Sequence, residues 1–220
     1  MTAPSAALPI VVLISGNGSN LQAIIDAIAR GELAAEIRAV ISNRPGAYGL
    51  ERARRAGIAT EVVDHRRYPD RAAFDNALRD TIDRYRPALV VLAGFMRILT
   101  PGFVRHYRGR MLNVHPSLLP RFRGLDTHRR ALAAGVAEHG VSIHFVTDEL
   151  DGGPVVIQKA VQILPGDDAE TLAGRVQAEE HRLYPKVIGW YAAGRLNIDD
   201  AGHVLFDGEA LTAPLPGDTA

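Results

Sequence analysis

The sequence predicts an α/β protein with one mostly parallel, twisted sheet and helices on both of its faces. Short runs that are almost entirely apolar, such as Ile10–Ser15 and Ala88–Ala93, alternate with segments whose apolar residues recur at helical spacing. Strands without a polar face are typical of parallel sheets that helices cover on both sides. Later in the chain two strands follow each other without a crossover helix. We therefore expect an antiparallel or mixed edge at the C-terminal end.

Three strand and helix pairs make up the first part of the chain. The expected strands are Ile10–Ser15, Ile37–Ser42 and Thr60–Val63. Apolar residues on one helical face mark the first and third helices: Leu21, Ile24, Ile25 and Ile28, and then Phe74, Leu78, Ile82 and Tyr85. Tyr48–Ala56 is the helix between them and ends at Gly57. Asp70 is placed to cap the third helix, because a short acidic side chain there can accept from the first free amides.

In the remaining part of the chain the alternation of strands and helices breaks down. Ala88–Ala93 and Met111–His115 are the fourth and fifth buried strands, and Val141–Phe145 and Val155–Val161 flank the loop Thr147–Pro154. A long helix over Asp168–Tyr191 follows, with an apolar face formed by Leu172, Val176, Leu183 and Val187. This order of elements indicates a Rossmann-like fold.

No repeat or linker divides the chain. We expect a flexible N-terminal tail over residues 1–9, one domain over residues 10–212, and a flexible C-terminal tail over residues 213–220, which is rich in Pro and Gly. Residues 1–9 lack the basic and apolar regions of a secretory signal, and the apolar runs are too short to span a bilayer. These features predict a soluble, cytoplasmic protein.

Composition narrows the chemistry. Lys plus Arg and Asp plus Glu are both 25, so the net charge is zero, which does not favour a nucleic-acid or membrane partner. There is no cysteine, which excludes disulfides, thiolate catalysis and sulfur-ligated metals. The histidines show no metal-ligand spacing, and Ser117 lacks the context of a nucleophilic serine. Without a nucleophile or a metal, direct attack by a substrate amine on an acyl donor is the natural chemistry.

The loop after the first strand, Gly16-Asn17-Gly18-Ser19-Asn20, opens directly into a helix. Glycines let backbone amides approach an anion, and a helix N-terminus favours negative charge. A dinucleotide site would need a glycine where Leu21 stands and an acid at Ser42 or Asn43. A small phosphorylated substrate therefore fits better than NAD. The alternative is a tight structural turn capped by Ser19 or Asn20.

Two polar residues, Asn113 and His115, interrupt the end of the fifth strand. Because they are two positions apart, they point to the same face, and Pro116 ends the strand where open α/β sheets bind ligands. An amide donor beside an imidazole suits stabilisation of an oxyanion together with proton transfer. The alternative is a satisfied structural histidine.

Asp151 is the expected partner of His115. It stands before Gly152, Gly153 and Pro154, a sequence that can shape a loop so that it aims a carboxylate. A carboxylate favours the cationic form of a neighbouring imidazole and orients its ring. The alternative for this sequence is an ordinary turn.

Four segments together resemble the formyltransferase family, in particular the folate-dependent phosphoribosylglycinamide formyltransferases. They are Ile14–Leu21, Ala93–Leu99, Asn113–Pro120 and Asp148–Pro154. Asn-x-His-Pro-Ser-Leu-Leu-Pro marks the wider family, and Gly-Asn-Gly-Ser-Asn near the start marks the narrower group. The likeness runs in order from Ile10 to Trp190.

The resemblance implies an enzyme of purine biosynthesis that needs no metal. It would transfer the formyl group of 10-formyltetrahydrofolate to the amine of 5-phosphoribosylglycinamide (GAR), acting on these two small molecules as a monomer or homodimer. The implied catalytic residues are Asn113, His115 and Asp151. The implied GAR-binding residues are Gly18, Ser19, Asn20 and Glu180. The implied folate-binding residues are Arg71, Met96, Arg97, Ile98, Leu99, Asn113 and Asp148. For Arg71 and Glu180, a solvated charge on a helix face is an equal alternative.

Arg121–Asp126 departs from the family pattern, which often has a proline before the glycine and a histidine at position 126. The relatives that act on methionyl-tRNA carry a further C-terminal domain, for which residues 191–220 leave no room. The formyltetrahydrofolate hydrolases carry an N-terminal regulatory domain, which a first strand at Ile10 does not allow. A folate- or nucleotide-binding module without activity is the alternative from another class.

Overall fold

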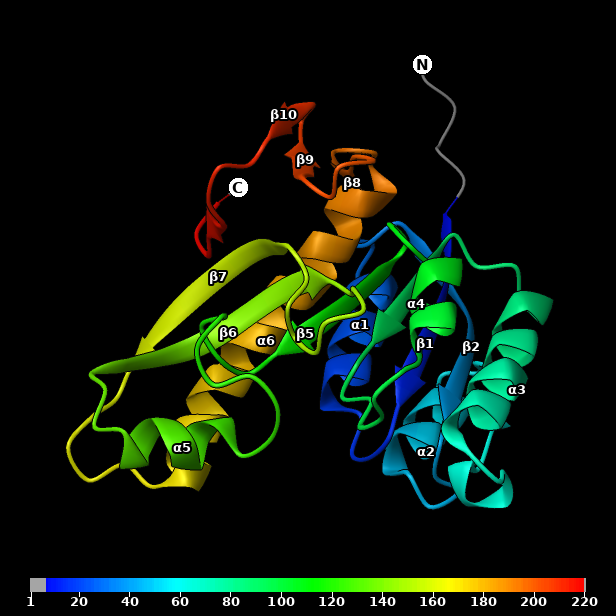
Figure 1. The fold of residues 1–220 in the computed structure, drawn as a ribbon, viewed down its shortest axis with the longest axis horizontal. Coiled ribbons are helices and arrows are strands. Elements are labelled where there is room, and N and C mark those ends of the chain that lie inside the picture. The colour runs from blue at the N-terminus through cyan, green and yellow to red at the C-terminus, as the bar shows by residue number, and fades with distance from the viewer. Residues whose placement is uncertain (1–6, 220) are drawn as a thin grey trace.

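The computed structural model describes residues 7–219 and has an eight-stranded sheet at its centre (Figure 1). The strands lie in the order β11-β7-β6-β5-β4-β1-β2-β3. The five central and N-terminal strands are parallel; they are β1 (Leu8–Ile14), β2 (Ala35–Ser42), β3 (Thr60–Val62), β4 (Leu89–Leu92) and β5 (Met111–His115). The first strand of the chain thus lies in the middle of the sheet, between β4 and β2.

The expected mixed edge is present. The strands β6 (Glu138–Phe145) and β7 (Val155–Gln162) run antiparallel, first to β5 and then to each other. The predicted fold class, a Rossmann-like and mostly parallel sheet with a mixed C-terminal edge, is therefore confirmed.

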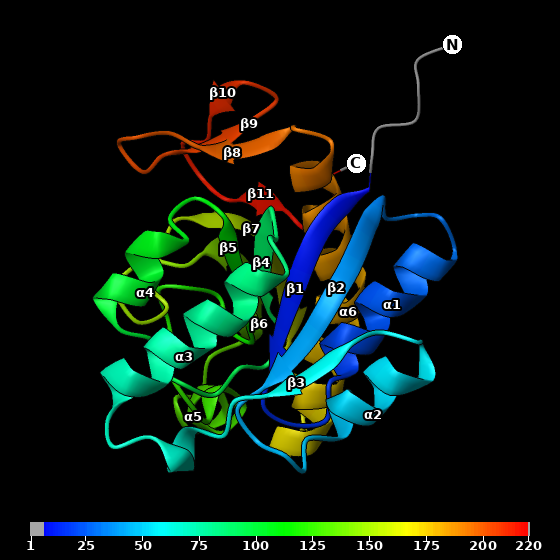
Figure 2. The ribbon, with the colours of Figure 1, turned by 90° about the vertical axis from the view of Figure 1, so that its right-hand side faces the viewer.

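Helices cover both faces of the sheet because the buried strands alternate their side chains between two cores (Figure 2). In β1, Ile10, Val12 and Ile14 point into one core. The helices on that side are α1 (Ser19–Ala29), α2 (Tyr48–Arg55) and α6 (Ala169–Ala192). Val11 and Leu13 point into the other core, where α3 (Arg71–Arg84) and α4 (Pro101–His106) pack. A polar substitution at these strand positions would place an unpaired group in a packed core.

Capping residues stand at the helix starts that the sequence predicts. The Asp70 carboxylate accepts from the Ala73 amide at the start of α3, as expected from its position. Asp168 caps α6 through a reciprocal pair with Thr171. At α1 the cap differs from the expected alternative, because Gly18 holds the cap position with φ 75° and no side chain accepts there. Ser19 and Asn20 are therefore free of capping contacts.

Several short elements were not expected. Three of them are the short helices α4 and α5 (Thr127–Ala133) and the 3-10 turn η1 (His65–Arg67). A separate antiparallel sheet follows α6 and contains β8 (Leu196–Ile198), β9 (Val204–Phe206) and β10 (Glu209–Ala210).

The ends of the chain differ in part from the expected tails. Residues 1–6 lie outside the described part, but β1 begins at Leu8, inside the segment assigned to the N-terminal tail. Near the other end, β11 (Leu215–Pro216) pairs in parallel with β7, and Asp218 forms an ion pair with Lys159 at 2.8 Å. A strand of two residues is too short to show an alternating sequence pattern, so it can be recognised only from its pairing with β7. In residues 7–219 no helix is long and apolar enough to cross a bilayer.

Candidate active site

A cavity of about 570 Å³ lies at the carboxyl ends of β4 and β5. Asn113, His115 and Asp151 all line it, so the structure brings Asp151 to the Asn113 and His115 pair from a distant part of the sequence. Asn113 and His115 come from the end of β5, and Asp151 comes from the loop between β6 and β7. Ligand sites of open α/β sheets lie at this end of the strands.

The ring of His115 is held between two oxygen atoms. Its Nδ1 lies 3.4 Å from Asp151 Oδ2, and its Nε2 lies 3.1 Å from the carbonyl oxygen of Phe122, which can only accept. The His115 side chain is buried and Asp151 is largely so, with 7% of the first and 11% of the second exposed. Each of these oxygens can accept a hydrogen bond from the ring nitrogen that it faces.

The loop that carries Asp151 is shaped by its own residues. Asp151 has φ 46°, a left-handed conformation that a short polar side chain tolerates. At Gly153 a Cβ atom would collide with the carbonyl oxygen of Phe145, so only glycine allows the loop to lie this close to the end of β6. The amide of Gly124 donates to Asp151 Oδ2 over 2.9 Å. The Asp151 Oδ2 atom is thus contacted by both the Gly124 amide and His115.

Asn113 is oriented by a histidine that the sequence reasoning did not assign to the site. His144 lies opposite Asn113 in the antiparallel register of β5 and β6. The His144 Nδ1 donates to the Phe145 carbonyl over 2.8 Å, so its Nε2 accepts from the Asn113 amide group over 3.1 Å. Burial lowers the pKa of His144, which keeps the ring neutral and able to accept. Only the register between the two strands could have revealed this pair.

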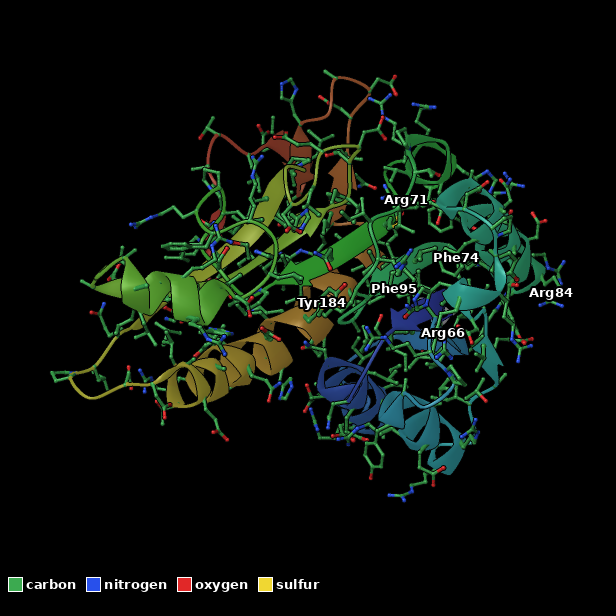
Figure 3. All side chains as sticks on the ribbon, turned by 60° about the horizontal axis from the view of Figure 1, so that its bottom comes forward. Arg66, Arg71, Phe74, Arg84, Phe95 and Tyr184 are labelled. Carbon is green, nitrogen blue, oxygen red and sulfur yellow. The ribbon has the colours of Figure 1, made fainter. Side chains whose placement is uncertain are left out.

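The residues expected to bind folate lie around this cavity and a smaller neighbour. Arg71, Met96, Arg97 and Ile98 line the cavity of about 570 Å³. Leu99 and Asp148 line an adjoining cavity of about 90 Å³, which also contacts Asp151. Arg71 at the start of α3 and Phe95 in the loop after β4 are labelled in Figure 3, which shows the side chains that these two elements contribute. Arg97 stacks on the ring of Phe74 at 5.8 Å.

Apolar side chains are exposed in the wall of the larger cavity. Met96, Ile98 and Leu150 are all at least half exposed, although side chains of this size are usually buried. Exposed apolar groups inside a concave site are typical of a surface that a ligand covers. Asp148 is less enclosed, since it is half exposed and faces Arg105 at 3.4 Å.

The residues expected to bind GAR meet one strand further along the sheet. The loop Gly16–Asn20 lies against α2, and a Cβ at Gly18 would lie 2.6 Å from the Cα of Gly49. Asn20 donates through Nδ2 to Glu180 Oε2 over 2.7 Å and so connects α1 to α6. Both side chains are buried. Burial raises the pKa of Glu180, which makes it unlike the solvated helix charge of the alternative interpretation.

Two further contacts surround this loop. Gln177, which the sequence reasoning did not assign to the site, donates to Ser19 Oγ over 3.0 Å. The sequence indicates this role only through spacing: Gln177 is three residues before Glu180 on α6, and residues i and i+3 share a helix face. The amide of Ser15 donates to the carbonyl of Gly94, which lines the larger cavity, so the loop and the cavity are neighbours. Within residues 7–219 no three His, Asp or Glu side chains gather in a metal-binding group.

The divergent segment Arg121–Asp126 is part of this site. It supplies the Phe122 carbonyl that faces His115 and the Gly124 amide that binds Asp151. Arg123 forms an ion pair with Glu149 in the Asp151 loop. This ion pair connects the two loops that border the catalytic candidates.

Comparison with known proteins gives a consistent result. Residues 8–188 match the formyl transferase family model. The chain is 56% identical to a phosphoribosylglycinamide formyltransferase of Escherichia coli (strain K12) over 92% of this chain and 95% of that protein. It is 43% identical to the trifunctional purine biosynthetic protein adenosine-3 of Homo sapiens, over 89% of this chain and 19% of that longer protein.

A solved structure shows the same similarity in three dimensions. The phosphoribosylglycinamide formyltransferase of Coxiella burnetii, in complex with CHES, superposes with a TM-score of 0.91 and 58% identity. The match covers 96% of this chain and 99% of that one.

Proposed function

The chain is an enzyme of the formyl transferase family, and we propose that it transfers the formyl group of 10-formyltetrahydrofolate to the amine of GAR. The products are formyl-GAR and tetrahydrofolate, in de novo purine biosynthesis. The match to the E. coli enzyme over nearly the whole length of both chains supports this substrate pair. The observation that supports the chemistry most is the 3.4 Å contact between His115 and Asp151 in the wall of the cavity that Asn113 also lines.

The residues around the larger cavity fit a folate. Met96, Ile98 and Leu150 offer apolar surface for a flat ring system, and Arg71 and Arg97 offer cations for the carboxylates of its glutamate tail. In this proposal the donor supplies an activated formyl carbon, and the protein supplies orientation, charge and proton transfer. The amine of GAR attacks that carbon directly.

Asn113 and His115 stabilise the negative charge that develops on the formyl oxygen. Asn113 donates one amide hydrogen to His144, which leaves the second for the oxygen. Both ring nitrogens of His115 face protein oxygens, so in this proposal its Nε2–H exchanges the Phe122 carbonyl for the formyl oxygen, while Nδ1 stays beside Asp151. Preorganised donors of this kind act more strongly in a site that excludes water than in solution.

Asp151 has a second task, which is proton transfer. The attacking amine must lose one proton, and the leaving nitrogen of the folate must gain one. The Asp151 carboxylate can accept the proton from the amine and then donate it to the leaving nitrogen of the folate. Either transfer can be direct or pass through a water molecule. GAR itself is held by the amides of Gly18, Ser19 and Asn20 around its phosphate and by Glu180 near its amine.

A formyl-transfer assay with purified protein, GAR and 10-formyltetrahydrofolate tests the proposal. We expect formyl-GAR and tetrahydrofolate to form in equal amounts and only when both substrates are present. Formate released without GAR would identify a hydrolase instead. Tight binding of both ligands without product would identify a binding module and refute the proposal.

A further inference from the structure

Ser15 and Asn43 form a buried hydrogen-bonded pair that the proposed chemistry does not use. Ser15 follows β1 and is 3% exposed, and Asn43 follows β2 and is fully buried. The Ser15 Oγ donates to Asn43 Oδ1 over 2.6 Å. Buried polar groups are costly unless they are hydrogen-bonded, so the contacts of this pair indicate what it holds in place.

Ser15 binds the backbone of the loop after β4 at two points. The Met96 amide donates to Ser15 Oγ over 2.7 Å, and the Ser15 amide donates to the Gly94 carbonyl over 3.1 Å. Gly94 has φ 76°, so the chain turns sharply as it leaves β4. The next side chains, Met96 to Ile98, form one wall of the larger cavity. The hydroxyl of Ser15 therefore anchors that wall at its first exposed residue.

Asn43 continues the network on the side away from the cavity. Its backbone carbonyl oxygen lies 2.9 Å from His65 Nδ1, and its side-chain Nδ2 lies 3.2 Å from the same ring nitrogen. The His65 ring meets the edge of Phe74 at 6.3 Å between centroids, and Arg97 stacks on that same ring. The wall is thus held at Met96 through Ser15 and at Arg97 through Phe74, and Asn43 connects the two supports.

We propose that Ser15 and Asn43 are positioning residues that fix the wall Met96–Ile98 in the shape that binds the formyl donor. This inference rests on the proposed function. Without the Ser15 hydroxyl the Met96 amide loses an acceptor in a partly buried position, and the loop spends part of its time in other conformations. A ligand binds more weakly in proportion to the fraction of molecules that can accept it, so the KM for the donor rises.

The test compares Ser15→Ala with Ser42→Ala as a matched control. Ser42 is fully buried at the end of the neighbouring strand, but among residues 7–219 its hydroxyl bonds only to the backbone of Arg44. Both variants lose one buried hydroxyl, and only the first loses a contact with the cavity wall. Asn43→Ala is the second test variant, because it keeps the Met96 acceptor but removes the partner of the Ser15 hydroxyl and the side-chain contact with His65.

We expect Ser15→Ala to raise the KM for 10-formyltetrahydrofolate about tenfold. The KM for GAR and kcat should stay within about twofold, since the phosphate loop and the catalytic candidates keep their contacts. Asn43→Ala should give a smaller rise in the same direction, and Ser42→Ala none. Backbone amide exchange of Met96, followed by NMR, should accelerate about tenfold in Ser15→Ala and remain as in the parent protein in Ser42→Ala.

The outcomes separate this inference from the proposed function. A parent protein that forms no formyl-GAR refutes the proposed function, and with it the inference. A parent protein that is active, with an unchanged donor KM in both Ser15→Ala and Asn43→Ala, overturns the inference alone. Equal rises in both KM values, or the same effect from Ser42→Ala, would show a general loss of stability and would also overturn it.

Discussion

Replacing Glu180 with glutamine removes a charge from a buried position and keeps the size of the side chain. Glu180 lies on α6, is 8% exposed, and accepts from Asn20 Nδ2 through Oε2 at 2.7 Å. Its other oxygen, Oε1, makes no hydrogen bond within residues 7–219. A glutamine keeps one carbonyl oxygen for Asn20. The substitution therefore separates the effect of the charge from the effect of packing.

The stability of the protein should rise at neutral and basic pH. Burial raises the pKa of Glu180 above its unfolded value, because the charged form is poorly solvated. The stabilisation from this carboxyl is therefore complete below its unfolded pKa and is lost as the pH rises through its folded pKa. At pH of about 8 the ionised group costs stability that glutamine does not, and at pH of about 4 the difference should disappear.

The activity should fall in the same variant. Under the proposed function, the free oxygen of Glu180 binds the amine end of GAR. A hydrogen bond to a charged group contributes about 1.5–3 kcal/mol, against about 0.5–1.5 kcal/mol for a neutral one. The loss of about 1–2 kcal/mol corresponds to about a 5- to 30-fold lower kcat/KM for GAR. The KM for the formyl donor should not change.

Thermal unfolding at the two pH values and steady-state kinetics at pH of about 8 are the assays. Glu179→Gln is the control, because Glu179 is the neighbouring residue on α6 and pairs with Arg182 at 2.7 Å near the surface. It should show neither the gain in Tm nor the loss of kcat/KM. A Glu180→Gln variant that is less stable than the parent at both pH values would contradict the burial argument. An unchanged kcat/KM for GAR would contradict the binding role.

Three other substitutions test the site and the core. Asn113→Ala should lower kcat by about 10² to 10³ with little change in Tm, because it removes one donor to the oxyanion; a loss below tenfold in the formyl-transfer assay would remove Asn113 from that role. Asp151→Asn should lower kcat by about 10² or more while circular dichroism shows an intact fold, and a variant that kept most of its rate would exclude the proposed proton transfer. Tyr184→Phe should cost about 2 kcal/mol, or about 4–8 °C in Tm, with kcat unchanged, because the buried hydroxyl lies 3.0 and 2.9 Å from the carbonyls of Leu92 and Leu112; an unchanged Tm would contradict this.

The parallel part of the fold could be predicted because β1, β4, β5 and the second half of β2 form apolar, buried runs. Ile37–Ser42 and Met111–His115, for example, lie within or match the strands β2 and β5. The short elements could not be predicted in the same way. The strand β11 has two residues and forms only because β7 offers free backbone groups beside it. The helix α4 spans less than two turns, too few for a periodic pattern.

The candidate site was predictable in its residues but only partly in its contacts. Asn113 and His115 share a face because they are two apart in one strand, which needs no tertiary information. The pairing of Asn113 with His144 depends on the register between β5 and β6, and a shift of one residue would have put His144 on the other face. The contacts of His115 with Phe122 and of Asp151 with Gly124 depend on how two loops fold over the strand end.

The sequence by itself determined which segments are strands and helices and which chemical groups stand at the ends of β1 and β5. These properties follow from backbone preferences and apolar spacing within a few residues. Only the tertiary structure decided that Asn20 meets Glu180, 160 positions away, and that Ser15 meets Asn43, 28 positions away. Such contacts depend on strand order and helix packing, which are set by the burial of the whole chain and by no local pattern.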